Sequence, residues 1–310
     1  MIVRRYHEED AVGWNGVNAA ARNGHFLFDR GFMEYHRDRF DDHSLIATED
    51  DRIQALLPAN RAGDIVFSHQ GLTFGGLVLA DACRQSRVLS VVDSVMTHLR
   101  EAGIRRFVYK PLPSIYAVRP ASEDLYALYR QGASLVRRDA STAIDYGEQG
   151  ALSNRRTRGA KKAAKSGLSF IESDRWAEFW EVLSETLRSR HAVAPVHELT
   201  EIRLLANRFP ASIRLFVASE GGSIVAGVVL FETVRVAHAQ YIAASERGRD
   251  IGALDGLFLH VIDHFRQTKR YFDFGISTED GGRRLNEGLI AQKEEFGGST
   301  IVHDVYELVL

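Results

Sequence analysis

Apolar residues in the first half of the chain follow the period of strands and then that of a helix. The elements that this pattern predicts are, in order, strands at 44–48, 53–57 and 65–67, a helix between Val88 and Leu99, and a strand at 107–109. The acidic residues 49–51 form the turn between the first two strands, which makes them a hairpin. A loop punctuated by glycines separates the third strand from the helix.

The second half shows the same succession of patterns. Its predicted elements are strands at 213–218, 224–231 and 237–243, a helix between Leu254 and Phe265, and a strand at 271–274. The order strand, turn, strand, strand, glycine loop, helix, strand therefore occurs twice, and we infer a structural duplication. The alternative is that two unrelated α+β units resemble each other by coincidence.

A strongly basic segment lies between the two series. Residues 153–167 contain six basic side chains and no acidic one. Alanines favour a helix here, Ser153 suits its N-cap, and Gly167 suits the residue that ends it. We expect the cationic face of this helix to bind phosphate through Arg156, Arg158 and Lys162. A solvated connector between domains is the alternative.

Length and composition describe an ordinary globular protein. The chain has 310 residues, of which 45% are hydrophobic and 26% are charged, and its net charge is −2. This length exceeds what one hydrophobic core usually supports, so we expect two domains. The slightly negative charge argues against a protein that coats DNA or a membrane with its whole surface.

Targeting and redox features favour the cytoplasm. No apolar run is long enough to span a bilayer, and the first ten residues lack the apolar core of a signal peptide. The single cysteine, Cys83, has no partner for an internal disulfide, and we expect it to be a buried small hydrophobe. We therefore expect a cytoplasmic protein without membrane insertion.

Absent motifs leave several enzyme classes without support. The chain contains no G-x-S-x-G, HExxH, CxxC or Walker A sequence. Serine hydrolase, zinc protease, zinc-ribbon and P-loop interpretations therefore have no basis in the sequence.

Three pieces of the chain, in this order, resemble one family. The basic segment is similar to the "RRxIxKAxKxG" element of FemAB-like members of the GNAT superfamily. Residues 271–275 (YFDFG) and 292–298 (QKEEFGG) look like the "yDFgG" and "FKxxFGG" motifs that close the second domain of that family. The resemblance covers residues 152–310 by motif, and the first half by the duplicated layout alone.

The resemblance implies an α+β fold with two tandem GNAT-like domains, each a mixed sheet flanked by helices, and a cleft between them. We place the domains at 1–150 and 151–303, and we expect the last strand, 304–310, to return to the first domain. The resemblance also implies an acyltransferase without a metal, whose donor is acyl-CoA or aminoacyl-tRNA and whose acceptor is a small-molecule or peptide amine. Since the peptide-bridge enzymes of the family use aminoacyl-tRNA, tRNA is a candidate partner, and DNA is not.

Two departures from the family patterns bear on this expectation. Gln292 stands where the family has a phenylalanine before the lysine, and Ile276 stands where it has a second glycine after the aspartate. The coenzyme A loop of ordinary GNAT enzymes, R/Q-x-x-G-x-G/A, falls at 249–254. Arg249 and Gly252 fit that pattern and are candidate donor contacts, but the last small position is occupied by a leucine.

Acyl transfer to an amine needs a neutral nucleophile, a donor for the oxyanion and a proton acceptor. The resemblance assigns the oxyanion role to Lys293, and the alternative is an exposed lysine paired with Glu294 or Glu295. Asp273 alternates with two phenylalanines, so its carboxylate points to the opposite face of the strand. There it either orients the amine or accepts its proton, or it caps the following loop.

Further polar residues of the second half complete this candidate site. The loop at 277–287 is polar and contains two adjacent glycines, so it can close over a substrate, although solvated loops have the same composition. Its expected substrate contacts are Ser277 and Asn286. Tyr241, on a preceding strand, is a further candidate contact.

In the first half, residues 67–76 occupy the position of the cofactor loop. Glycines there let backbone amides approach a phosphate or a sugar. The candidates for binding and for general-base catalysis are Ser68, His69, Gly75 and Gly76, and His69 has a structural role in a turn as its alternative. By the symmetry of the duplication, we expect Lys110 and Tyr116 to face the cleft.

Three functions fit these observations. We expect an N-acyltransferase that moves an acetyl or aminoacyl group from an activated donor to an amine of a sugar nucleotide, amino acid or peptide precursor, in the biosynthesis of the cell envelope or of a polysaccharide. The alternatives are a FemAB-type transferase that forms peptide bonds from aminoacyl-tRNA, and a non-catalytic GNAT-like module that binds a ligand. The retained lysine and aspartate favour an enzyme.

Overall fold

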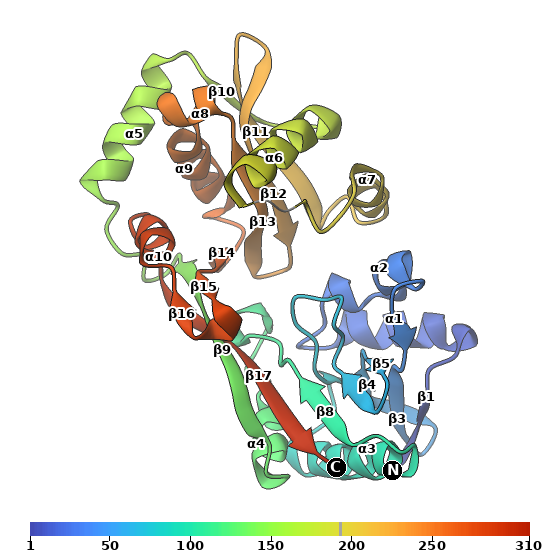
Figure 1. Ribbon diagram of the computed structural model, residues 1–310. Helices are drawn as coiled ribbons and strands as arrows, with labels where there is room; N and C mark the ends of the chain where they lie inside the picture. Colours follow the sequence, from blue (N-terminus) through green and yellow to red (C-terminus); the bar gives the residue numbers. More distant parts are fainter. Residues whose placement is uncertain (192–193) are drawn as a thin grey trace. The chain divides into compact units, whose positions relative to one another are not determined.

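The computed structural model describes residues 1–191 and 194–310, and the chain forms two compact units (Figure 1). Unit 1 comprises Met1–Asp139, Glu279–Arg284 and Val302–Leu310, and unit 2 comprises Ala140–Thr278 and Leu285–Ile301. Both units combine β-sheet with flanking helices, which confirms the predicted α+β class. Within the described ranges, no helix is long and apolar enough to cross a membrane.

Unit 1 contains two groups of paired strands. One is an antiparallel sheet in the order β1-β3-β4-β7, and the other contains the run β17-β8-β6-β5-β2. The elements along this part of the chain are β1 (Ile2–Arg5), α1 (Ala11–Ala20), α2 (Arg30–Met33), β2 (Asp41–Asp42), β3 (Leu45–Glu49), β4 (Arg52–Leu57), β5 (Asn60–Ala62), β6 (Ile65–Phe67), β7 (Val78–Leu79), α3 (Gln85–Glu101), β8 (Arg106–Tyr109), α4 (Glu123–Arg130) and β9 (Ser134–Asp145).

Helix α3 forms much of the core of unit 1. The apolar positions that predicted this helix are all buried against β3, β4 and β8: Val88, Val91, Val92, Val95 and Leu99. Burying one such side chain contributes about 1.5–3 kcal/mol. Gly103, two residues after the helix, has a φ of 73°, a left-handed conformation that favours glycine.

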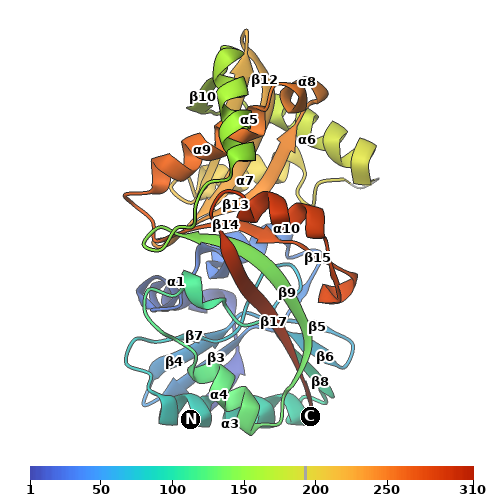
Figure 2. The ribbon, with the colours of Figure 1, turned by 90° about the vertical axis from the view of Figure 1, so that its left-hand side faces the viewer.

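Unit 2 is built on a sheet with helices on both faces. Its strand order is β10-β11-β12-β13-β14-β9, antiparallel except for the parallel pair β13 and β14. Helix α9 packs on one face with α5 beside it, and α6 packs on the other (Figures 1 and 2). The elements are α5 (Asn154–Lys165), β10 (Ser169–Glu172), α6 (Trp176–His191), α7 (Leu199–Arg208), β11 (Ile213–Glu220), β12 (Ser223–Glu232), β13 (Val236–Ala244), α8 (Glu246–Asp250), α9 (Ala253–Phe265), β14 (Tyr271–Ile276), β15 (Thr278–Glu279), β16 (Arg284–Leu285), α10 (Glu287–Glu294) and β17 (Ser299–Val309).

Strand pairing supports the inferred duplication. In unit 1, β6 pairs in parallel with β8, and the chain between them contains α3. In unit 2, β13 pairs in parallel with β14, and the chain between them contains α8 and α9. Each half therefore makes the same strand, loop, helix and strand crossover, in the order that the sequence predicted.

Two long strands differ from the sequence prediction. β9 has no counterpart in the prediction because Arg137, Arg138 and Asp139 interrupt its apolar pattern. Arg138 forms a bidentate ion pair with Asp304 of β17, at 2.6 and 2.8 Å, which places these charges on neighbouring strands. β17 begins at Ser299 rather than at residue 304, and its residues 306–309 pair with β8. Both β9 and β17 have residues in each unit.

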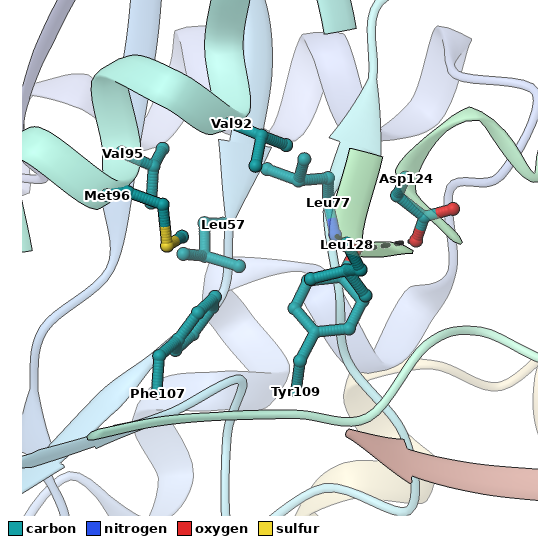
Figure 3. A pocket seen from close by; sticks show the side chains of 9 residues that line it. All are labelled: Leu57, Leu77, Val92, Val95, Met96, Phe107, Tyr109, Asp124 and Leu128. Atoms are coloured by element: carbon teal, nitrogen blue, oxygen red, sulfur yellow. Dashed lines mark hydrogen bonds between the residues drawn. The ribbon is translucent and has the colours of Figure 1, made fainter. Parts of the chain in front are cut away.

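A buried carboxyl group lies in the core of unit 1 (Figure 3). Asp124, in the first turn of α4, lines a small apolar cavity together with Leu77 and Tyr109. The Tyr109 hydroxyl donates a hydrogen bond to Asp124 at 2.6 Å and accepts one from the Leu77 N–H at 2.7 Å. Burial raises the pKa of Asp124 to about 6.

Asp124 makes the stability of unit 1 depend on pH. Because its pKa is higher in the folded state than its ordinary value of 3.8, its contribution to stability is complete below pH 3.8 and is lost as the pH rises to about 6. We expect the free energy of unfolding of the wild type to fall over this range relative to Asp124→Asn. Urea unfolding followed by Trp14 fluorescence, with Phe at Trp176 and Trp180, measures the difference. A difference that is constant with pH contradicts the expectation.

Candidate functional site

Polar residues of unit 2 gather where β13 and β14 separate. The two parallel strands are paired only from Val236 and Tyr271 to His238 and Asp273. Immediately afterwards the register between β13 and β12 shifts, and Gln240 is the extra residue of a β-bulge. Bulges take the extra residue out of the hydrogen-bond ladder and are frequent beside active sites. We call the end of this paired segment the fork and take it as the candidate site.

Asp273 is a buried acceptor at the fork. It accepts hydrogen bonds from the Ser141 hydroxyl, the Gly275 backbone N–H and the His238 ring, each at 2.9 Å. The neighbouring phenylalanines pack in the core under α9, so the carboxylate points to the other face of the sheet, as the alternation predicts. Its side chain is fully buried and its oxygens are engaged, so Asp273 contacts His238 and does not present a free oxygen to an external group.

His238 is the residue at the fork that the sequence did not single out. It lies on β13 directly beside Asp273, and its side chain is 11% exposed. The sequence offered one signal for His238, namely a polar residue in the otherwise apolar start of β13. That signal became specific only once β13 and β14 were known to be neighbours, with His238 opposite Asp273.

Lys293 lies in the last turn of α10 and is buried. Its ammonium donates hydrogen bonds to the carbonyl oxygens of Gly275 and Ile276, both at 2.7 Å. Burial lowers its pKa to about 8, and the nearby charge of Asp273 acts in the opposite direction. Lys293 is therefore not the exposed lysine of the alternative interpretation. Since an ammonium has three N–H groups, one remains for another acceptor.

The other predicted contacts of unit 2 divide between two places. Ser277 and Asn286 meet after β14, where the Asn286 N–H donates to the Ser277 carbonyl at 2.9 Å and the Asn286 side chain caps α10. Ser277 is buried, and its hydroxyl has no hydrogen-bond partner in the described part of the chain. Tyr241 lies instead in a buried cluster, with its hydroxyl on His197 and its ring 5.3 Å from that of Trp180.

Helix α5 is the predicted basic helix, with both predicted ends confirmed. The Ser153 hydroxyl accepts the Arg156 N–H at 3.2 Å, and Gly167 follows the helix with a φ of 68°. Arg158 and Lys162 are exposed, and among the residues described neither has an ion pair. They are thus available to an external phosphate.

Arg156 is not placed like the other cations of α5. Its guanidinium is buried, pairs with Asp255 of α9, lies 2.9 Å from a carboxylate oxygen of Glu295, and stacks 5.0 Å from the ring of Phe296. Two carboxylates already neutralise its charge. Arg156 therefore joins α5 to its neighbours, and the phosphate-binding role that we expected for it does not fit this environment.

Helix α5 also covers the first turn of α9, where the coenzyme A pattern falls. A Cβ on Gly252, whose φ is 74°, would lie 2.8 Å from the carbonyl oxygen of Gly159 in α5. A Cβ on Gly159 would in turn lie 1.7 Å from the carboxylate of Asp255, which sits in the first turn of α9. Arg249 donates to the carbonyl oxygen of Ala244 at 2.7 Å. These positions therefore serve packing inside unit 2.

The glycine loop of unit 1 surrounds Lys110. The Lys110 ammonium donates to the Leu72 carbonyl at 2.5 Å, and its backbone N–H donates to the Ser68 hydroxyl at 2.7 Å. A Cβ on Gly75 would lie 1.7 Å from the Ser68 carbonyl oxygen, and Gly76 has a φ of 87°. The loop residues thus contact each other and Lys110, and the two glycines permit that close approach.

His69 and Tyr116 are buried in the aromatic core of unit 1. The Nδ1 of His69 accepts the Gly71 N–H at 3.2 Å. Burial, together with the charge of His36, lowers the pKa of His69 to about 3. An imidazole with this pKa is a weak proton acceptor at neutral pH, so the structural role fits His69 better than the base role. Tyr116 packs its ring 4.8 Å from that of Phe74.

Comparison with known protein families decides the nature of unit 2. The sequence of residues 153–281 matches the family described as the acetyltransferase (GNAT) domain. This stretch is thus similar to GNAT acetyltransferase domains. The domain contains the fork, α5 and α9, and it makes the chain an enzyme of the acyltransferase class. No protein with a curated description matches this sequence.

Solved structures extend the likeness to the whole chain. FemX has a TM-score of 0.69 and 12% identity, over 100% of this chain and 98% of its own. The C-terminal domain (DUF2156) of a putative lysylphosphatidylglycerol synthetase from Agrobacterium fabrum has a TM-score of 0.63 and 16% identity, over 96% and 91%. A tandem GNAT protein of the clavulanic acid pathway has a TM-score of 0.53 and 11% identity, over 99% and 98%. At these identities the likeness is one of fold, and at that level the resemblance to FemAB-like GNAT proteins is confirmed.

Metal-binding groups are a separate question. Across the described residues, His, Cys, Asp and Glu side chains nowhere form a group of three that could hold a metal ion.

Arg156 and Arg158 give a matched test of the packing of α5. Replacing Arg156 by Met leaves Asp255 and Glu295 partly buried without their counterion, and we expect a loss of about 3 kcal/mol. Arg158→Met, two residues away on the exposed face, should change stability by less than about 0.5 kcal/mol. Urea unfolding followed by the fluorescence of Trp176 and Trp180 measures both, and equal small losses would contradict the role of Arg156.

Proposed function

We propose that this acyltransferase takes an aminoacyl group from a charged tRNA and joins it to an amine of a sugar nucleotide, an amino acid or a peptide precursor. The observation that carries the choice of donor is the position of α5. This helix covers the N-terminus of α9 with one face and presents exposed cations on the other.

The covered N-terminus of α9 argues against a donor held there by its pyrophosphate. A helix N-terminus binds phosphate through free backbone N–H groups and the positive end of its dipole. At α9, the carbonyl oxygen of Gly159 lies against Gly252, and the carboxylate of Asp255 occupies the first turn. These contacts bring the backbone of α5 against the first turn of α9. This favours a donor whose phosphates bind elsewhere.

The exposed face of α5 suits such a donor. Its cations are Arg158, Lys161, Lys162 and Lys165, all exposed and without ion pairs among the residues described. Closely spaced cations without carboxylate partners attract a polyanion, because binding releases the counterions of its phosphates. The fold shared with FemX over the whole chain, and the basic element that resembles the FemAB family, agree with a tRNA donor.

The fork supplies the groups that aminoacyl transfer requires. The amine attacks the ester carbonyl and an oxyanion develops, which a fixed donor stabilises. The third N–H of Lys293 is the candidate for this donor, since its other two are held by Gly275 and Ile276. Burial of Lys293 strengthens its effect on a developing charge.

A transfer assay tests the proposal directly. The purified chain is incubated with aminoacyl-tRNA carrying a labelled amino acid, or with labelled acyl-CoA, and a panel of sugar nucleotides, amino acids and peptides. We expect amide product from aminoacyl-tRNA and none from acyl-CoA. Product from acyl-CoA alone overturns the choice of donor. A ligand that binds without any turnover would instead indicate the non-catalytic module.

The exposed cations of α5 should carry part of the affinity for tRNA. We expect the variant Arg158→Gln, Lys161→Gln, Lys162→Gln to reduce the slope of log affinity against log salt by about 2–3, because each phosphate contact contributes roughly 0.9. The matched control removes three exposed cations of unit 1, Arg52, Arg84 and Arg100. Fluorescence titration of tRNA at several salt concentrations measures the slopes. Equal slopes in the two variants would count against α5 as the contact.

Lys293 predicts how turnover depends on pH. If its ammonium stabilises the oxyanion, kcat falls as the pH rises through about 8, where Lys293 loses its proton. Lys293→Arg should move this fall to higher pH because the guanidinium stays charged. Lys293→Ala should lower kcat by about 10²–10³-fold with little change in KM. An unchanged pH profile in Lys293→Arg would leave Lys293 with only a structural role.

A further inference from the structure

Three side chains at the fork form a chain of hydrogen bonds. Ser141 on β9 donates to one oxygen of Asp273, and the Nδ1 of His238 lies 2.9 Å from the other. An ionised carboxylate only accepts hydrogen bonds, so Nδ1 of the neutral imidazole carries the proton and Nε2 carries the lone pair. The partners of Asp273 therefore fix both the tautomer and the orientation of the ring.

The other edge of this ring carries Nε2. Within the described residues, no group forms a hydrogen bond with Nε2, and the side chain is partly exposed. Gly275 faces the ring, since a Cβ there would lie 3.4 Å from Cε1 of His238, so the residue at this position places no side chain against that edge. The bulge at Gln240 begins two residues further along the same strand. His238 thus stands beside the place where β13 leaves its partner.

Other titratable groups considered for this role are less suitable. Asp273 is fully buried, with its oxygens engaged. Lys293 donates two hydrogen bonds to backbone carbonyls and is needed as a cation in the proposed chemistry. His69 belongs to the buried core of unit 1. His238 combines a free lone pair with partial exposure.

The geometry points to His238 as the group that accepts the proton of the attacking amine, with Asp273 as its positioning residue. This inference rests on the proposed function. The amine nitrogen forms a bond with the carbonyl carbon of the aminoacyl ester while its N–H proton passes to Nε2. The bond between that carbon and the ribose oxygen then breaks, the electron pair stays on the oxygen, and Nε2–H returns the proton to it. No oxidant or further reactant is required.

The ring has charged and polar neighbours on three elements. Asp273 on β14 contacts it directly, and Lys293 on α10 interacts with that carboxylate. Ser141 on β9 is polar but does not titrate in this range.

Replacing His238 by Gln removes the proton acceptor and keeps a polar side chain. We expect kcat/KM for aminoacyl transfer to fall about 10²–10³-fold, with the loss in kcat and the KM for aminoacyl-tRNA unchanged. With hydroxylamine as acceptor, which is neutral without a base, the loss should be much smaller. Asp273→Asn should lower kcat/KM less than His238→Gln does, because it disturbs only the position of the ring. Its loss of kcat/KM should also be smaller with hydroxylamine than with an amine acceptor. His260→Gln, a partly exposed histidine of α9 outside the fork, is the matched control and should retain full activity.

Each outcome has one meaning. If the wild type forms no amide from aminoacyl-tRNA, the proposed function fails. If the wild type is active and His238→Gln keeps its rate, the inference about His238 fails while the proposed function stands. An equal loss with peptide amine and with hydroxylamine also overturns the inference, because a structural defect affects both acceptors alike. If His238→Gln does not fold, His238→Ala is tested with added imidazole instead. Recovery of its transfer activity supports the inference, and no recovery in folded His238→Ala contradicts it.

Discussion

The ion pairs of Arg156 hold together the parts of unit 2 on which the candidate site depends. This buried guanidinium contacts Asp255 in the first turn of α9 and Glu295 at the end of α10, and it stacks on Phe296. The backbone N–H of Ser153 donates to the carbonyl of Glu295 at 2.9 Å, so the start of α5 is fixed to the end of α10 by a second contact. An unpaired charge at this position would be costly, and this makes the arrangement of the three helices a specific one.

Two consequences for the site follow from this arrangement. With α5 in place, Gly159 lies against Gly252, the contact from which we propose that the first turn of α9 does not bind the donor. With α10 in place, Lys293 reaches the carbonyls of Gly275 and Ile276 and fixes the end of β14. The strand so held presents Asp273 to the ring of His238. One buried cation in α5 thus bears on both the proposed choice of donor and the position of the proposed reacting groups.

The sequence predicted those elements whose apolar spacing is regular. α3 and α9 were predicted because their buried residues recur at helical intervals, and the parallel pairs around them agree with the inferred duplication. β9 was missed because charged residues interrupt its apolar pattern. One of them, Arg138, pairs with Asp304, which lies far away in the sequence.

The roles of single residues were harder to predict, for a physical reason. Arg156 and Arg158 are equivalent in the sequence, and only the distant carboxylates of Asp255 and Glu295 make one of them structural. His238 gained its significance from Asp273, on a strand that the chain reaches only after a helix. Gly252 fits a cofactor pattern locally, yet its close neighbour is a carbonyl oxygen of α5. Contacts between segments far apart in the sequence decided all three.

Titration of coenzyme A by isothermal calorimetry tests the central claim most directly, namely that α5 closes the anion site at the N-terminus of α9. The claim predicts no saturable binding of coenzyme A up to about 1 mM, which corresponds to a binding free energy weaker than about −4 kcal/mol. Saturable binding at micromolar concentrations, together with slowed hydrogen exchange of the backbone amides of residues 252–255, would contradict it.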